Sequence, residues 1–183
     1  MLKNLINNNT TDKDTIHSYL EPYEDIFQKR KNDEVKLLEI GVYMGGSIKL
    51  WKDYFTNGII HGVDISDEGS IKENDIKNHE RVKLHMKTNA YDNNFIKSFD
   101  FKFDIIIDDG PHTLDSMIYV VKNYIPLLKS DGVLVIEDIQ SVSWINTLKE
   151  NTPEIYHKNI KIIDNRNVKQ RQDDILYIVD LSM

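Results

Sequence analysis

The sequence contains no cysteine and no long apolar run. Because none of its 183 residues is Cys, disulfides, zinc–thiolate sites and cysteine nucleophiles are excluded. No apolar stretch approaches the roughly 20 residues of a membrane-spanning helix. The polar, Asn-rich start of the chain also lacks the apolar core that a signal peptide needs. We therefore expect a cytoplasmic protein that binds no membrane.

Basic residues are fewer than acidic ones. The chain has 23 Lys and Arg against 30 Asp and Glu, a formal net charge of −7, which argues against binding to nucleic acid. With 40% hydrophobic residues and no internal repeat, low-complexity tract or linker, its length suits one well-buried α/β domain. We predict a single domain with an N-terminal helical cap over residues 1–33 and a core over residues 34–183, and leave open whether it forms a homo-oligomer.

Two acidic clusters follow short apolar runs. Residues 103–109 (Phe-Asp-Ile-Ile-Ile-Asp-Asp) and 132–138 (Gly-Val-Leu-Val-Ile-Glu-Asp) are typical of buried parallel strands. Ligands of an open parallel sheet bind outside the carboxyl ends of its strands, and neighbouring strands lie about 4.8 Å apart. Asp109, Glu137 and Asp138 are therefore predicted to converge on one cation. The alternative is that they are solvated acids that cap the following helices.

Other apolar patterns complete the predicted sheet. Further strands are expected at 35–42, 59–65, 82–88, 160–163 and 175–179. Helical patterns are expected at 12–31 (two short helices), 48–55, 69–78, 117–128 and 144–149. The last two strands have no helix between them, so we expect an antiparallel hairpin at the sheet edge, because parallel neighbours need a longer connection. Residues 1–11 and 164–174 are predicted to be flexible.

A glycine-rich turn follows the first predicted strand. Glycine lacks a Cβ and admits positive φ, so a ligand can approach the backbone closely. The dinucleotide fingerprint G-x-G-x-x-G would place glycine at position 43, but the run from Gly41 to Gly46 has Tyr43 there. That missing glycine is the one that admits a pyrophosphate. A NAD-dependent oxidoreductase is therefore disfavoured.

Two more acids indicate which ligand this turn binds instead. Glu39 lies inside an apolar strand, where a buried carboxylate is costly without a cation or donors, and a ligand amino group would satisfy it. Asp64 ends the second strand, where a carboxylate accepts hydrogen bonds from ribose hydroxyls. An amino group and a ribose without a pyrophosphate favour S-adenosylmethionine. The alternative is that both are strand-end acids facing water.

These motifs resemble a known enzyme family. Residues 38–47 are similar to motif I of the class I S-adenosylmethionine-dependent methyltransferases. Residues 108–112 and 135–138 resemble the metal and base motifs of the metal-dependent macrolide sugar O-methyltransferases, the mycinamicin and tylosin tailoring type. Residues 11–27, which include Lys13 and His17, resemble the segment before motif I in that family. The resemblance implies a Rossmann-like α/β sheet of seven strands, the last antiparallel, with helices on both faces.

The resemblance also implies roles for single residues. His112 is implied to be the general base, with Asp109 as its catalytic partner, and His17 to line the pocket. Asp109, Glu137 and Asp138 are implied to bind Mg²⁺ or another divalent cation. Because successive strand residues face opposite sides, Glu137 and Asp138 reach one ion only if the strand bends there. Glu39, Gly41, Ser47 and Asp64 are implied to line the S-adenosylmethionine cofactor, and we predict that Tyr43, Gly45, Asn89 and Asp108 contact it as well.

The predicted function is metal-assisted O-methylation of a sugar or glycosylated small molecule. A sugar hydroxyl is a poor nucleophile at neutral pH, but a divalent cation lowers its pKa and a neutral imidazole accepts its proton. His112 precedes a predicted helix, whose positive end disfavours the imidazolium. Two alternatives stay open. One is a catechol-type phenol O-methyltransferase, in which His112 would be dispensable, and the other is a non-catalytic adenosyl-ligand-binding domain.

Overall fold

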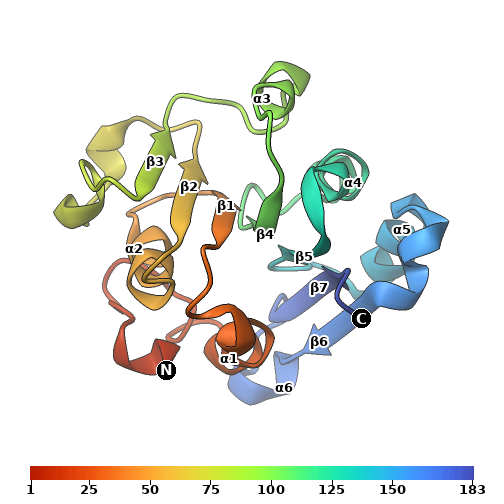
Figure 1. Cartoon of the computed structure of the whole chain (residues 1–183). Coiled ribbons are helices and arrows are strands. Elements are labelled where there is room, and N and C mark those ends of the chain that lie inside the picture. The colour runs from red at the N-terminus through yellow and green to blue at the C-terminus, as the bar shows by residue number, and fades with distance from the viewer.

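Seven strands form one mixed β-sheet in the computed structural model, which describes residues 1–183 (Figure 1). Their order across the sheet is β3-β2-β1-β4-β5-β7-β6. The pairs from β3 to β5 are parallel, whereas β7 is antiparallel to both β5 and β6. The predicted Rossmann-like sheet with an antiparallel last strand is confirmed. The strands are β1 (Lys36–Ile40), β2 (Ile59–Val63), β3 (Val82–His85), β4 (Phe103–Asp108), β5 (Leu128–Ile136), β6 (Ile160–Asp164) and β7 (Ile175–Asp180).

Helices cover both faces of the sheet. In Figure 1, α1 and α2 lie on one face, and α3, α4 and α5 lie on the other. The longest helices, α4 and α5, have 10 residues each, and no helix has the length and apolar character needed to cross a membrane. The helices are α1 (Leu20–Phe27), α2 (Gly46–Tyr54), α3 (Asn93–Lys97), α4 (Leu114–Asn123), α5 (Val142–Asn151) and α6 (Arg166–Lys169).

Strand β4 shows how the sequence builds a core on each face. All six of its residues are buried. Ile105 and Ile107 join the core under α1 and α2, whereas Ile106 joins the core under α4 and α5, because successive strand residues point to opposite faces. At the end of the following loop, Thr113 and Ser116 form a capping box that starts α4. This cap places the start of α4 directly after His112.

The last two strands form the expected hairpin, but β7 lies inside the sheet and β6 is the edge. Their connector, predicted to be flexible, contains α6 and is tied to the N-terminal segment. The Asn165 amide donates to the Ser18 carbonyl at 2.7 Å, and Lys169 Nζ donates to the His17 carbonyl at 2.6 Å. Asp174 at its end is fully buried. These hydrogen bonds hold part of the connector against the N-terminal segment, while residues 167–172 are exposed.

The N-terminal residues also differ from the prediction. Leu2 is fully buried, and its N–H donates to Glu24 Oε2 at 2.6 Å, so residues 1–11 pack against the core. Within 12–31, only α1 and the 3₁₀ turn Gln28–Arg30 are helical. The predicted helix at 69–78 is also wrong: the stretch forms two 3₁₀ turns, Glu68–Ser70 and Asn74–Ile76. This stretch has too few apolar residues to form the apolar face of an amphipathic helix, because Ile71 and Ile76 are its only buried apolar residues.

Candidate functional site

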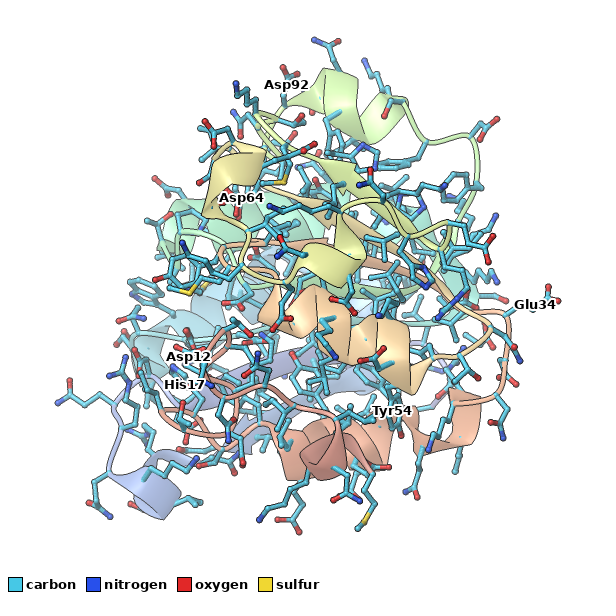
Figure 2. The ribbon with its side chains drawn as sticks, turned by 90° about the vertical axis from the view of Figure 1, so that its left-hand side faces the viewer. Asp12, His17, Glu34, Tyr54, Asp64 and Asp92 are labelled. Carbon is cyan, nitrogen blue, oxygen red and sulfur yellow. The ribbon has the colours of Figure 1, made fainter.

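A cavity of about 770 Å³ opens at the carboxyl ends of β1, β2 and β4. The loops after these strands form one side of it, and residues 8–16 of the N-terminal segment form the other. Asp12 from that segment and Asp64 from the end of β2 both line the cavity and stand well apart in Figure 2, where Asp12 lies beside His17. The position agrees with the rule that open parallel sheets bind ligands beyond the carboxyl ends of their strands.

The glycine-rich turn after β1 forms the floor of the cavity. Gly41 has a φ of +95°, and a Cβ built there would lie 2.0 Å from the Asp109 carbonyl oxygen. Glycine is therefore required at this position, where the turn passes directly over the loop after β4. Tyr43 also has a left-handed backbone, with a φ of +46°, and its ring is 67% exposed at the cavity rim.

Asp64 holds this turn in place. Its Oδ2 accepts hydrogen bonds from the N–H groups of Val42 and Tyr43 at 2.8 and 2.9 Å, and its Oδ1 accepts one from the N–H of Ser66. These bonds lower the pKa of the Asp64 carboxyl against the opposing effect of burial. Asp64 is thus an ionised acceptor at the end of β2 that faces the cavity.

The structure divides the eight predicted cofactor contacts into two groups. Those that line the cavity are Gly41, Tyr43, Ser47, Asp64 and Asn89. Glu39, Gly45 and Asp108 lie behind its wall. Gly45, with a φ of +86°, starts α2 against the Ile76 side chain. Asp108 is 2% exposed, and its Oδ1 accepts a hydrogen bond from the Tyr91 hydroxyl at 2.9 Å. Burial raises the pKa of Asp108 to about 6, so it supports Tyr91, which itself lines the cavity.

Asp109, His112 and Asp138 come together at one side of the cavity. His112 Nε2 lies 3.6 Å from Asp109 Oδ1 and 3.5 Å from Asp138 Oδ2. One ligand atom from each of the three residues lies within 4.8 Å of the others. Two carboxylate oxygens at this separation suit a divalent cation such as Mg²⁺ or Mn²⁺, and the imidazole of His112 lies beside them.

Two of these residues have strained backbones. His112 and Asp138 have φ values of +53° and +56°, in the left-handed region that costs about 1–3 kcal/mol for residues other than glycine. At Asp138 this conformation bends the chain directly after β5. The bend turns Asp138 toward the cavity, while Glu137 is 2% exposed and faces the interior.

Lys13 is the partner of Glu137 in the interior. Its Nζ lies 2.5 Å from Glu137 Oε1, 2.7 Å from Asp109 Oδ2 and 3.5 Å from Glu39 Oε1. The Lys13 side chain is fully buried. Burial acts to lower the pKa of Lys13, but the three carboxylates raise it well above its ordinary value. Lys13 is therefore a buried ammonium ion.

Glu39 faces a cation from within the chain. Its carboxylate is fully buried, and Lys13 Nζ lies 3.5 Å from its Oε1. Burial raises the pKa of Glu39 to about 7, although Lys13 opposes this shift. Neither oxygen accepts a hydrogen bond within the chain. The sequence offered no route to this contact, because Lys13 and Glu39 lie on different elements.

Asp138 is held by two residues of the N-terminal segment. The Tyr19 hydroxyl donates to Asp138 Oδ1 at 2.5 Å, and His17 Nδ1 lies 3.2 Å from the same oxygen. His17, predicted to line the cavity, is 2% exposed and lies behind Asp138. Tyr23 from α1 donates to Glu137 Oε1. The resemblance pointed to this segment but assigned no role to its tyrosines.

A family described as "Methyltransferase domain" matches residues 38–139. The match covers more than half of the chain and includes the glycine-rich turn and both acidic clusters. The chain belongs to this methyltransferase family. The N-terminal residues that contact the acidic clusters lie before the matched region of the methyltransferase domain.

Individual relatives of this methyltransferase domain are longer proteins. The 8-demethyl-8-alpha-L-rhamnosyl tetracenomycin-C 2'-O-methyltransferase of Streptomyces olivaceus is 31% identical over 141 residues, which are 73% of this chain and 36% of that protein. The mycinamicin VI 2''-O-methyltransferase of Micromonospora griseorubida is 30% identical over 142 residues, or 70% of this chain and 33% of that protein. The chain thus spans about a third of the length of these curated relatives.

A solved structure confirms the fold. The methyltransferase MycE of mycinamycin biosynthesis, in complex with Mg, SAH and mycinamycin VI, superposes with a TM-score of 0.69. The similarity covers 91% of this chain and 50% of that chain, at 22% sequence identity. At this identity the likeness shows the shared methyltransferase fold.

Proposed function

We propose that this domain is an S-adenosylmethionine-dependent, divalent-metal-assisted O-methyltransferase that acts on a hydroxyl of a sugar or glycosylated small molecule. The observation that carries the proposal is the placement of His112 Nε2 between one oxygen of Asp109 and one of Asp138, on the wall of the cavity above the glycine-rich turn. The named activities of the relatives, sugar O-methylations among them, support the same reaction class.

The cavity suits the proposed cofactor. Its volume of about 770 Å³ is within the range of small-molecule sites. Gly41 allows a ligand to approach the backbone, Asp64 offers a carboxylate to the ribose, and Asn89 offers an amide to adenine. MycE, of similar fold, was solved with SAH and Mg, which supports the same two ligands here.

The residues also suit the proposed cation. Asp109 Oδ1 and Asp138 Oδ2 face the cavity, while the other oxygen of each is bound to Lys13 or Tyr19. A bound divalent cation would lower the pKa of an acceptor hydroxyl and fix its direction. His112 would take the hydroxyl proton at Nε2. The acids orient the acceptor and the turn orients the cofactor, so much of the acceleration would come from in-line placement.

The charge around the cavity favours a neutral acceptor. Asp12, Asp64, Asp109 and Asp138 all line it, and the chain as a whole carries a net charge of −7. These carboxylates would repel a phosphate backbone. We therefore propose a small-molecule acceptor in place of a nucleic acid.

Isothermal titration with S-adenosylmethionine and with NAD, each with and without Mg²⁺, tests the proposal. We expect S-adenosylmethionine to bind and NAD not to bind. Methyl transfer is then measured with sugar glycosides and with catechols as acceptors. Binding of NAD, or of neither ligand, would overturn the proposal. Transfer to catechols alone would favour the phenol-directed alternative.

A further inference from the structure

A tight turn begins at Asp12 and has two faces. The Asp12 carbonyl oxygen accepts hydrogen bonds from the N–H groups of Thr15, Ile16 and His17 at 3.1, 3.0 and 3.0 Å. Lys13 and His17 form the inner face and are at most 2% exposed. Asp12, Thr15 and Ile16 are exposed and line the cavity. The turn therefore contacts the acids at the strand ends with one face and presents the other face to the cavity.

The contacts of the inner face fix the position of the outer face. Lys13 Nζ donates to Asp109 Oδ2 at 2.7 Å, and His17 Nδ1 lies 3.2 Å from Asp138 Oδ1. Both acids belong to the proposed cation site. Lys169 Nζ donates to the His17 carbonyl at 2.6 Å and holds the turn from the side of the connector. The outer side chains are therefore fixed at the end of the cavity where the acceptor hydroxyl would meet the cation.

The Asp12 carboxylate is available to a ligand at this end of the cavity. Its side chain is 52% exposed. Its one ion-pair contact within the chain, His17 Nε2, lies 3.8 Å from Oδ2, too far for a hydrogen bond. Asp12 and Asp138 face the two different nitrogens of the same imidazole ring, and Figure 2 shows Asp12 beside His17. Asp12 is thus a hydrogen-bond acceptor close to the proposed cation site and outside the group of acids that converge there.

We propose that Asp12 accepts a hydrogen bond from a second hydroxyl of the acceptor, a neighbour of the hydroxyl that is methylated. The substrate class is therefore a sugar with adjacent hydroxyls. This inference rests on the proposed function and adds to it the residue that selects the acceptor. Thr15 lies on the same wall and offers its own hydroxyl. Ile16, 43% exposed, offers apolar surface to the C–H bonds of a sugar ring.

Charge and position both favour this assignment. A sugar hydroxyl donates to a carboxylate oxygen in a charge-assisted hydrogen bond, which is stronger than a bond between neutral groups. An anionic acceptor would instead be repelled by Asp12 and Asp138 together. The ribose of the proposed cofactor lies elsewhere, because Asp64 stands well apart from Asp12 in Figure 2. The acceptor is therefore the ligand that best suits Asp12.

Binding and turnover of p-nitrophenyl glycosides of rhamnose, glucose and galactose test the inference. Binding is followed by NMR titration with Mg²⁺ and S-adenosylhomocysteine present, and the glycoside that binds most tightly is used further. We expect D12A to raise its dissociation constant and KM at least about tenfold and to change kcat less than about threefold. D14A removes the same charge from the same turn, at a residue that does not line the cavity, and should leave all three unchanged.

Deoxy analogues of this glycoside isolate the contact. The analogue without the neighbouring hydroxyl should bind the wild-type chain about tenfold more weakly than the parent glycoside does. D12A should bind the two equally, so that the substitution and the loss of the hydroxyl are not additive. D12N keeps an acceptor oxygen and should lose less affinity for the parent glycoside than D12A does.

Titrations with S-adenosylmethionine and with Mn²⁺ separate this role of Asp12 from two others. D12A should change each affinity less than about threefold. A larger loss would assign Asp12 to the cofactor or to the cation and would overturn the inference, as would equal affinity of D12A and the wild type for the glycoside. If the wild type binds the cofactor and a glycoside while these results go against Asp12, the inference alone fails. If the wild type binds no cofactor or no glycoside, the proposed function fails, and the inference fails with it.

Discussion

His112 is the residue on which the proposed chemistry depends most directly. It has a left-handed backbone directly before the cap of α4, and its Nε2 lies between two carboxylates. Strained residues of this kind persist only where their surroundings impose the conformation. Here the loop after β4 and the capped start of α4 impose it on both sides.

Replacing His112 by Gln should reduce turnover with a sugar acceptor at least about 100-fold, because a general base contributes about 10²- to 10⁴-fold. The dissociation constant of S-adenosylmethionine should change less than about threefold, since His112 acts on the acceptor. Steady-state kinetics and titration calorimetry measure the two quantities. H79Q, at a histidine away from the cavity, is the control. Full activity of H112Q would remove His112 from the mechanism.

Gly41 is the residue at which the backbone leaves no room for a side chain. Gly41→Ala would place a Cβ about 2 Å from the Asp109 carbonyl oxygen in a left-handed conformation. We expect the free energy of unfolding to fall by about 2–4 kcal/mol and S-adenosylmethionine binding to be lost. Urea denaturation and calorimetry measure these effects. Gly69→Ala, in an exposed turn, should be nearly neutral, and equal effects at both positions would contradict this account of the turn.

At the scale of single elements, β2 and β3 carry a pair of histidines away from the cavity, of which His61 is buried and His85 half-buried. His61 Nδ1 and His85 Nε2 lie 3.1 Å apart, and the rings are stacked. Phe99 packs edge-on against both. Burial lowers the pKa of His61 to about 4, and it lowers that of His85 as well. Both imidazoles are therefore neutral in the folded chain near pH 7.

This pair predicts a loss of stability in mild acid. Unfolded histidine has a pKa of about 6.5, so between that value and the folded pKa of His61, about 4, the unfolded chain binds the extra proton. The contribution of His61 to the free energy of unfolding should be largest above pH 6.5 and fall by up to about 3 kcal/mol as the pH decreases to 4, whereas the raised pKa values of Glu39 and Asp108 act in the opposite direction. Urea titrations across this range measure it. H61F should remove this loss of stability toward acid and H79F should not; a profile that H61F leaves unchanged would contradict the assignment.

The N-terminal segment supplies most of the contacts that hold the acids of the site. The motifs of the core give no indication of these contacts. Lys13, His17 and Tyr19 from this segment and Tyr23 from α1 supply the partners of both acids that follow β5. Their spacing is typical of an amphipathic helix, yet only the part from Leu20 onward is helical. The side chains of the preceding residues bond instead to Glu39 on β1 and to the acids that follow β4 and β5.

For the whole molecule, cofactor binding should appear as thermal stabilisation. A ligand that binds only the folded state at 100 times its dissociation constant adds about 2.7 kcal/mol, and 1 kcal/mol raises the Tm of a domain of this size by about 2–4 °C. We expect S-adenosylmethionine to raise the Tm by about 5–10 °C. Scanning calorimetry measures this shift, with NAD at the same concentration as the control. An equal shift with NAD would contradict the proposed cofactor specificity.

The sequence by itself determined the sheet, the glycine-rich turn and the positions of the acids at the strand ends. These features are local: β-branched runs such as Ile105–Ile107 indicate buried strands, and a left-handed turn requires Gly41. The parallel pairing of β1 with β4 and of β4 with β5 then brings their carboxyl ends to one edge. The prediction of helices was less accurate in stretches where burial decided the backbone conformation and the spacing of apolar residues did not.

Only the tertiary structure decided which way each acid faces and what holds it. Glu137 and Asp138 are adjacent in sequence, yet the left-handed bend at Asp138 sends one side chain to the interior and the other to the cavity. The ammonium that Glu39 required is Lys13, which is 26 residues earlier in the chain. Such contacts depend on long-range packing of the N-terminal segment over the strand ends. No local pattern encodes them, because the charge that satisfies a buried acid can come from any element that reaches it.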